Sequence, residues 1–107
     1  MSSKIVKELI SSNKLMIFSK SYCPYCIKVK SLFTNLGVIN NAKIIELDLV
    51  ENGSELQNEM AKICGRSSVP QVFIGSKHVG GSDDVHALHK RNELVPQLKI
   101  ALNIQNL

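Results

Sequence analysis

Two cysteines lie three positions apart where a short apolar run gives way to a helical pattern, in the segment Phe18–Lys30, FSKSYCPYCIKVK. Such a C-x-x-C pair serves as half of a zinc site, as a structural disulfide or as a redox centre. Each of these uses requires a different set of neighbours. The surroundings of Cys23 and Cys26 therefore restrict both the fold and the chemistry of the chain.

The spacing of apolar residues predicts an α/β fold over all 107 residues. Helices are expected where apolar residues recur every three or four positions, and strands where they run together or alternate. A strand–helix–strand unit pairs its strands in parallel, and a hairpin adds an antiparallel pair. We therefore expect a four-stranded mixed sheet flanked by helices on both faces. The predicted order is a helix around 5–10, a strand over 14–19, a helix over 23–36, a strand over 43–50, a helix over 54–64, a hairpin over 70–81 and a helical stretch over 82–103.

Local signals predict how two of these helices begin. Ser54 and Gln57 have the spacing of a capping box before the third helix. Ser82 or Asp83 is expected to cap the last helical stretch. That stretch should break near Pro96, because proline cannot continue the helical hydrogen-bond ladder.

Composition argues against several classes of function. Apolar runs such as LMIF are much shorter than the roughly 20 residues of a membrane span, and the charged N-terminus lacks the apolar core of a signal peptide. A net charge of +4 with 5% aromatic residues and no Trp gives little material for stacking nucleic-acid bases. We therefore expect no membrane partner, no nucleic-acid partner and a cytoplasmic location.

The cysteine pair fits a redox centre better than the two alternatives. A reducing compartment disfavours a structural disulfide, and structural zinc needs four ligands, whereas Cys64 stands alone, so we expect no metal. Cys23 begins a predicted helix, whose unpaired N–H groups and macrodipole stabilise a thiolate, and Pro24 suits the first helical position. Lys20 is expected to add positive charge, while Cys26 lies one turn further and lacks this advantage.

The segments CPYC, SVPQVFIG and HVGGSDD together resemble those of dithiol glutaredoxins, and the resemblance covers essentially the whole chain. Thioredoxins typically carry a different dipeptide between their cysteines and a Trp before the first, where this chain has Tyr22. The resemblance implies a thioredoxin fold, a single glutaredoxin domain over 1–107 and a monomer. It also implies a thiol–disulfide oxidoreductase that uses glutathione to reduce protein–glutathione mixed disulfides and protein disulfides, with Cys23 as nucleophile and Cys26 as resolving thiol.

The same resemblance implies which residues bind glutathione. Lys20 and Gln57 would contact its glycine carboxylate, and the backbone of Val69 would pair with its cysteinyl unit. Asp83 would pair with the γ-glutamyl ammonium. The full set implied is Lys20, Tyr25, Gln57, Val69, Pro70, Gly81, Ser82 and Asp83.

Alternatives remain open at the level of the sequence. Gln57 could serve only the capping box, Asp83 only as a helix cap, and Cys64 as a small buried apolar residue. A thioredoxin-like reductase would draw electrons from a flavoprotein instead of glutathione. An iron–sulfur carrier would bridge a cluster between two chains through Cys23 and glutathione, a use that Pro24 should disfavour by stiffening the loop.

Overall fold

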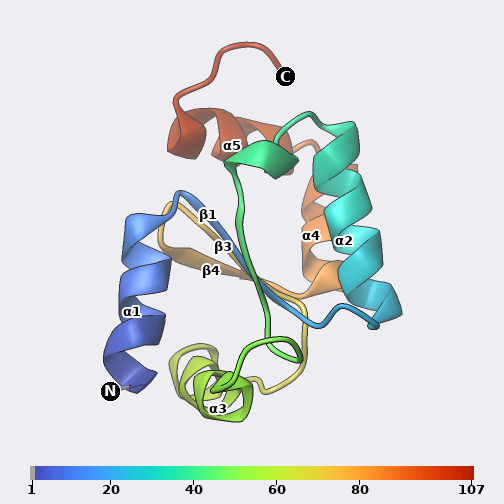
Figure 1. Cartoon of the computed structure of the whole chain (residues 1–107). Coiled ribbons are helices and arrows are strands. Elements are labelled where there is room, and N and C mark those ends of the chain that lie inside the picture. Colours follow the sequence, from blue (N-terminus) through green and yellow to red (C-terminus); the bar gives the residue numbers. More distant parts are fainter. Residues whose placement is uncertain (1) are drawn as a thin grey trace.

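Strand β1 (Leu15–Ser19) is buried along its whole length and lies at the centre of the computed structural model, which describes residues 2–107 (Figure 1). It pairs in parallel with β2 (Lys43–Glu46) and antiparallel with β3 (Gln71–Ile74), which forms a hairpin with β4 (Lys77–Gly80). The sheet order is β2-β1-β3-β4. The predicted four-stranded mixed sheet is thus confirmed.

Helices cover both faces of this sheet, because a strand that is apolar on both sides must be buried on both sides. Figure 1 shows α1 and α3 on one side of the strands and α2 and α4 on the other. None of the helices within residues 2–107 is both long enough and apolar enough to cross a membrane. The helices are α1 (Ser2–Ser12), α2 (Pro24–Asn35), the 3-10 helix η1 (Ile39–Asn41), α3 (Gly53–Cys64), α4 (Ser82–Lys90) and α5 (Leu94–Leu102).

Alternate side chains of β1 belong to two separate apolar cores, as the period of a strand requires. Leu15 and Ile17 pack with apolar residues of α2, α4 and α5. Met16 and Phe18 pack with apolar residues of α1 and α3. Since β1 is anchored in both cores, the loop that follows it leaves the sheet from a fixed point.

Two predictions around the second strand are wrong. This strand ends at Glu46 instead of residue 50, because the N–H of Leu49 donates to the carbonyl of Glu46 at 2.9 Å and forms a turn. The side chain of Leu49 is consequently 71% exposed. The capping box of Ser54 and Gln57 does not form, since α3 already begins at Gly53 and Gln57 bonds to a loop beyond the helix.

The C-terminal helical stretch also differs from the prediction. It divides into α4 and α5 at 91–93, before Pro96. Pro96 lies in the first turn of α5, where its missing N–H removes no helical hydrogen bond. Gly81 is the N-cap of α4, so the prediction that Ser82 or Asp83 caps this helix is wrong.

The register of the sheet brings three distant segments together at one end. Phe18, near the end of β1, lies opposite Gln71 at the start of β3. Gly80, at the end of β4, lies opposite Val72. The loop after β1, the loop before β3 and the start of α4 therefore meet, although they are separated by up to about sixty positions along the chain.

Candidate functional site

Cys23 occupies the residue just before the first turn of α2. Its backbone is extended, with φ −80° and ψ 121°, and Pro24 follows as the first helical residue. Its carbonyl accepts the N–H of Ile27 at 3.0 Å, so the chain enters the helix directly at the cysteine. The predicted place of Cys23 at a helix start is confirmed, and its partly exposed thiol lies beside the unpaired N–H groups of the first turn.

The two thiols of the C-x-x-C pair have shifted pKa values in opposite directions. Partial burial would raise the pKa of Cys23, but hydrogen bonds from the backbone and thiol of Cys26 and from the backbone of Tyr25 outweigh it and lower that pKa. Burial raises the pKa of Cys26, whose side chain is fully buried, despite an N–H of Lys20 that donates to its sulfur at 3.4 Å. Cys23 is therefore the thiol that ionises first.

A cation that the sequence did not single out assists Cys23. Lys30, on α2, contributes to the lowered pKa of Cys23, after the hydrogen bonds. Lys30 also pairs with Glu46 at 2.7 Å, which holds its ammonium group between α2 and β2. Lys20 acts on the pair through its backbone N–H, which donates to the sulfur of Cys26.

A carboxylate that the sequence reading missed holds the loop before Cys23. Asp48 accepts the backbone N–H of Ser21 at 2.9 Å and the hydroxyl of the same residue. These two bonds lower the pKa of Asp48, so it is ionised at neutral pH. Because Asp48 lies in the turn after β2, it fixes the approach to α2 from the edge of the sheet.

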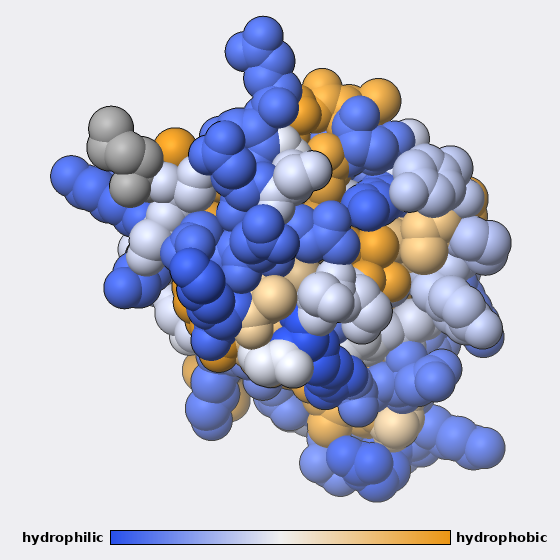
Figure 2. Space-filling view, turned by 90° about the horizontal axis from the view of Figure 1, so that it is seen from below, coloured by the Kyte–Doolittle hydropathy of each residue, from blue (hydrophilic) through white to orange (hydrophobic). Residues whose placement is uncertain are grey.

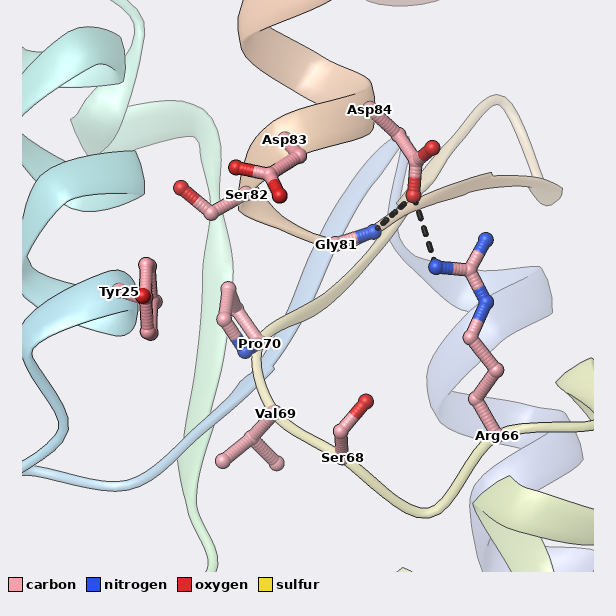
Figure 3. A pocket seen from close by; sticks show the side chains of 9 residues that line it. All are labelled: Tyr25, Arg66, Ser68, Val69, Pro70, Gly81, Ser82, Asp83 and Asp84. Atoms are coloured by element: carbon pink, nitrogen blue, oxygen red, sulfur yellow. Dashed lines mark hydrogen bonds and ion pairs between the residues drawn. The ribbon is translucent and has the colours of Figure 1, made fainter.

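A groove of about 220 Å³ runs from the beginning of α2 to the beginning of α4 (Figure 3). The sulfur of Cys23 lies at its margin, 3.8 Å from the carbonyl oxygen of Val69. Seen from below, the molecule is mostly hydrophilic with small apolar patches between polar side chains (Figure 2). The groove is lined by Tyr25, Arg66, Ser68, Val69, Pro70, Gly81, Ser82, Asp83 and Asp84.

Six of the eight residues expected to bind glutathione line this groove, and two do not. Lys20 lies in the loop between β1 and α2, and Gln57 lies on α3. The side-chain amide of Gln57 donates to the carbonyl of Ser67 at 2.6 Å, next to the groove wall. The six lining residues are Tyr25, Val69, Pro70, Gly81, Ser82 and Asp83.

One wall of the groove is the segment 66–70, and the buried side chain of Gln71 supports it from behind. The amide of Gln71 donates to the carbonyl of Ser68 at 3.1 Å and lies 3.4 Å from its hydroxyl. The amide oxygen of Gln71 in turn lies 2.7 Å from Nε2 of His78 on β4. The peptide bond between Val69 and Pro70 is cis.

The other wall is the first turn of α4. The two glycines just before this helix, Gly80 and Gly81, allow neighbouring groups to approach the backbone closely. A side chain at Gly80 would collide with the carboxylate of Asp84, and the φ of Gly80 is +129°, which favours glycine. A Cβ at Gly81 would lie 3.3 Å from the carbonyl oxygen of Pro70 in the opposite wall. Asp83 is exposed, and Figure 3 shows Asp84 turned away from it toward Arg66.

Sequence reasoning missed Arg66 and Asp84, although both line the groove. Asp84 has a local signal, because a carboxylate three residues after an N-cap can accept the N-cap N–H, here that of Gly81 at 2.9 Å. Arg66 has no such signal. It meets Asp84 only because the register of β3 and β4 brings their flanking segments together.

Comparisons with known proteins agree on one family. The family model described as Glutaredoxin matches residues 15–79. A curated glutaredoxin from Ricinus communis is 50% identical over 92 residues, which are 86% of this chain and 88% of that protein. The mitochondrial glutaredoxin-2 of Bos taurus is 42% identical over 91 residues, 85% of this chain and 57% of that protein.

Solved structures of the same family share the fold. The holo form of glutaredoxin C1 from Populus tremula x tremuloides superposes with a TM-score of 0.90 at 46% identity, covering 98% of this chain and 93% of that one. A buckwheat glutaredoxin–glutathione complex superposes with a TM-score of 0.92 at 41% identity, covering 98% and 94%. The expected thioredoxin fold is confirmed by these matches.

The opposite pKa shifts predict the order in which the cysteines react with iodoacetamide. Because the pKa of Cys23 is lowered, its thiolate persists as the pH falls below the ordinary cysteine value of about 8.5, and its labelling midpoint should lie below that value. Cys26 should react only at higher pH, since burial raises its pKa. The chain is labelled at pH values from about 4 to about 10, a range that spans the ordinary pKa of a cysteine thiol. Peptide mass spectrometry of the labelled samples then gives both midpoints.

The urea-unfolded chain is the control for this measurement. Without the helix start, Cys23, Cys26 and Cys64 should share one midpoint near the ordinary value. A folded-state midpoint for Cys23 at or above that of the unfolded chain would contradict the assignment of Cys23 as the stabilised thiolate.

Proposed function

This chain belongs to the glutaredoxin family, and on that premise we propose that it is a glutathione-dependent oxidoreductase that reduces protein–glutathione mixed disulfides and protein disulfides. The observation that supports this most is the place of the Cys23 sulfur, 3.8 Å from the carbonyl of Val69 at the margin of the groove. A disulfide of glutathione laid along the groove would present its sulfur to this thiolate. Binding and reaction would thus share one surface.

The proposed reaction consists of two exchanges. The Cys23 thiolate attacks the glutathione sulfur of a mixed disulfide, the old S–S bond breaks, and the target leaves as a thiolate that takes up a proton. The thiolate of a second glutathione then attacks the glutathione sulfur held by Cys23, releasing glutathione disulfide and regenerating the Cys23 thiolate. Across the two exchanges, the sulfur of the second glutathione is oxidised to the disulfide level while the sulfur of the target is reduced to a thiol. A lowered pKa assists both steps, because it increases the fraction of Cys23 that is ionised for attack and makes Cys23 a better leaving group afterwards.

Protein disulfides would require the second cysteine. After Cys23 has formed a mixed disulfide with the target, the sulfur of Cys26 would lose its proton and attack the sulfur of Cys23, forming an internal Cys23–Cys26 disulfide and releasing the target as a dithiol. Two glutathione molecules would then reduce the internal disulfide and leave as glutathione disulfide. Cys26 is fully buried with a raised pKa, so it stays protonated and does not compete for the first attack. The burial of Cys26 thereby separates the two roles.

The groove and the residues next to it offer partners for each end of glutathione. The exposed carboxylate of Asp83 can pair with the γ-glutamyl ammonium, and N–H groups at the start of α4 can bind the adjacent carboxylate. The backbone of Val69 would pair with the cysteinyl unit, with the ring of Tyr25 on the opposite side. Lys20 and Gln57 would reach the glycine carboxylate from outside the groove. Gln57 would use its second amide N–H, because the first is bonded to the loop.

Substitution of each cysteine by serine tests the division of roles. Cys23→Ser should abolish activity on all substrates, because a serine hydroxyl is scarcely ionised at neutral pH and cannot exchange with a disulfide. Cys26→Ser should still reduce a glutathionylated peptide, at an equal or higher rate, because the intermediate can no longer form an internal disulfide. The measurement couples turnover to glutathione reductase with a glutathionylated peptide and, separately, with a protein disulfide.

With a protein disulfide as substrate, Cys26→Ser should give the opposite result. On that substrate Cys26→Ser should stop as a covalent complex with its target, visible on a non-reducing gel. A Cys26→Ser enzyme that is inactive on the glutathionylated peptide would refute the one-cysteine route and favour a thioredoxin-like mechanism.

Substitution of Asp83 tests the groove independently of the thiols. Asp83→Ala removes the proposed partner of the ammonium group, and loss of such a charge-assisted bond should cost about 1.5–3 kcal/mol, roughly a ten- to hundredfold loss of kcat/KM. Folding should change by less than about 1 kcal/mol, since Asp83 is an exposed first-turn residue and not the N-cap.

The matched control is Glu93→Ala, which removes another exposed carboxylate at the start of a helix, α5. Both variants are compared by urea unfolding and by turnover of the glutathionylated peptide. Equal kinetics for the two variants would show that Asp83 does not bind the substrate.

A further inference from the structure

The two walls of the groove are joined by one side-chain bridge that the proposed reaction does not use. Nη1 of Arg66, on the loop wall, donates to Oδ2 of Asp84, on the helix wall, at 2.8 Å (Figure 3). The same oxygen of Asp84 accepts the backbone N–H of Gly81 at 2.9 Å. Of the four ion pairs found among residues 2–107, this is the one whose two partners both line the groove.

The remaining contacts between the walls are close but are not side-chain bonds. A Cβ at Gly81 would meet the carbonyl of Pro70 at 3.3 Å and Nη1 of Arg66 at 4.0 Å, so the backbones nearly touch there. The loop wall is otherwise held by bonds from residues outside the helix wall, from Gln71 to Ser68 and from Gln57 to Ser67. The Arg66–Asp84 pair therefore joins the loop wall to the helix wall, on the side of the loop opposite the sheet.

The pair also sets the charge at the start of α4. Asp83 and Asp84 lie next to each other in the first turn, and the guanidinium of Arg66 neutralises one of them. The N–H of Gly81 and the guanidinium of Arg66 keep the pKa of Asp84 low, so this carboxylate is ionised at neutral pH. Without Arg66, two uncompensated carboxylates would face a ligand that itself carries two carboxylates.

We propose that Arg66 is a positioning residue for substrate binding, which sets the separation of the groove walls and the charge of the helix wall through its pair with Asp84. This inference rests on the proposed function, because it concerns how the same groove holds glutathione. Arg66 and Asp84 are 47% and 42% exposed, and ion pairs that exposed contribute little to folding. A purely structural pair would therefore leave binding unaltered, whereas a positioning pair changes binding more than stability.

The test uses Arg66→Gln, Asp84→Asn and the double variant of the full chain. Asp84→Asn keeps an acceptor for the N–H of Gly81 but loses the charge that pairs with Arg66. Each single substitution should raise KM for a glutathionylated peptide about three- to tenfold with little change in kcat. The reason is that a displaced wall weakens substrate binding and leaves the chemical step at Cys23 unaltered. The double variant should resemble the single ones, since they break the same pair.

Two further readouts separate positioning from general damage. Arg91→Gln breaks a pair of similar exposure, Arg91 with Glu93 at 2.9 Å, away from the groove, and should leave KM unchanged. The iodoacetamide midpoint of Cys23 should also stay constant in every variant, because the hydrogen bonds that lower its pKa come from Cys26 and Tyr25, which the substitutions leave in place. Melting temperatures of all variants should agree within a few degrees.

The outcomes distinguish this inference from the proposed function. A wild-type enzyme that saturates with the glutathionylated peptide, beside Arg66→Gln and Asp84→Asn variants with unchanged KM, would overturn the positioning role alone. Additive effects in the double variant would overturn it as well, since they would mean that the two residues act separately. A wild-type enzyme without turnover of glutathionylated peptide would overturn both.

Discussion

The stabilisation of a sulfur anion at the first turn of α2 is the interaction on which the chemistry of this protein depends. It requires Cys23 to sit just outside the helix, where N–H groups without helical partners are available. Three features hold that position: β1 is buried in two apolar cores, Pro24 starts the helix, and Asp48 ties down the loop between them. The fold thus places a reactive anion on a rigid support.

The two cysteines differ because the helix turns one of them inward. Cys23 stays partly exposed at the groove margin, while Cys26, three residues later, points into the protein and is fully buried. Burial disfavours a thiolate, and the hydrogen bonds that Cys26 donates help to stabilise the one on Cys23. The same pair of residues therefore yields one thiol that ionises readily and attacks, and a second thiol that stays protonated at neutral pH.

The sequence was sufficient to predict features that local patterns encode. The apolar run of β1, the position of Cys23 at a helix start and the hairpin around Gly75 all follow from short-range rules. Errors arose where tertiary contacts replaced a local option. Gln57 bonds to Ser67 in the loop beyond the helix instead of completing a capping box, and Lys30, which no local pattern pointed to, contributes to the lowered pKa of Cys23. The Arg66–Asp84 pair joins residues 18 positions apart and depends on sheet register, which no local pattern records.

The central claim is that the thiolate and the groove act on one ligand. It is tested most directly by nuclear magnetic resonance of isotope-labelled Cys26→Ser protein whose Cys23 carries glutathione, compared with the same protein whose Cys23 carries only a methylthio group. Both forms hold the same disulfide, so the differences in amide shifts report the rest of the glutathione molecule. The account predicts differences that gather at Val69 and at 81–83, on the two walls of the groove. Differences confined to Cys23 and its immediate neighbours would contradict it.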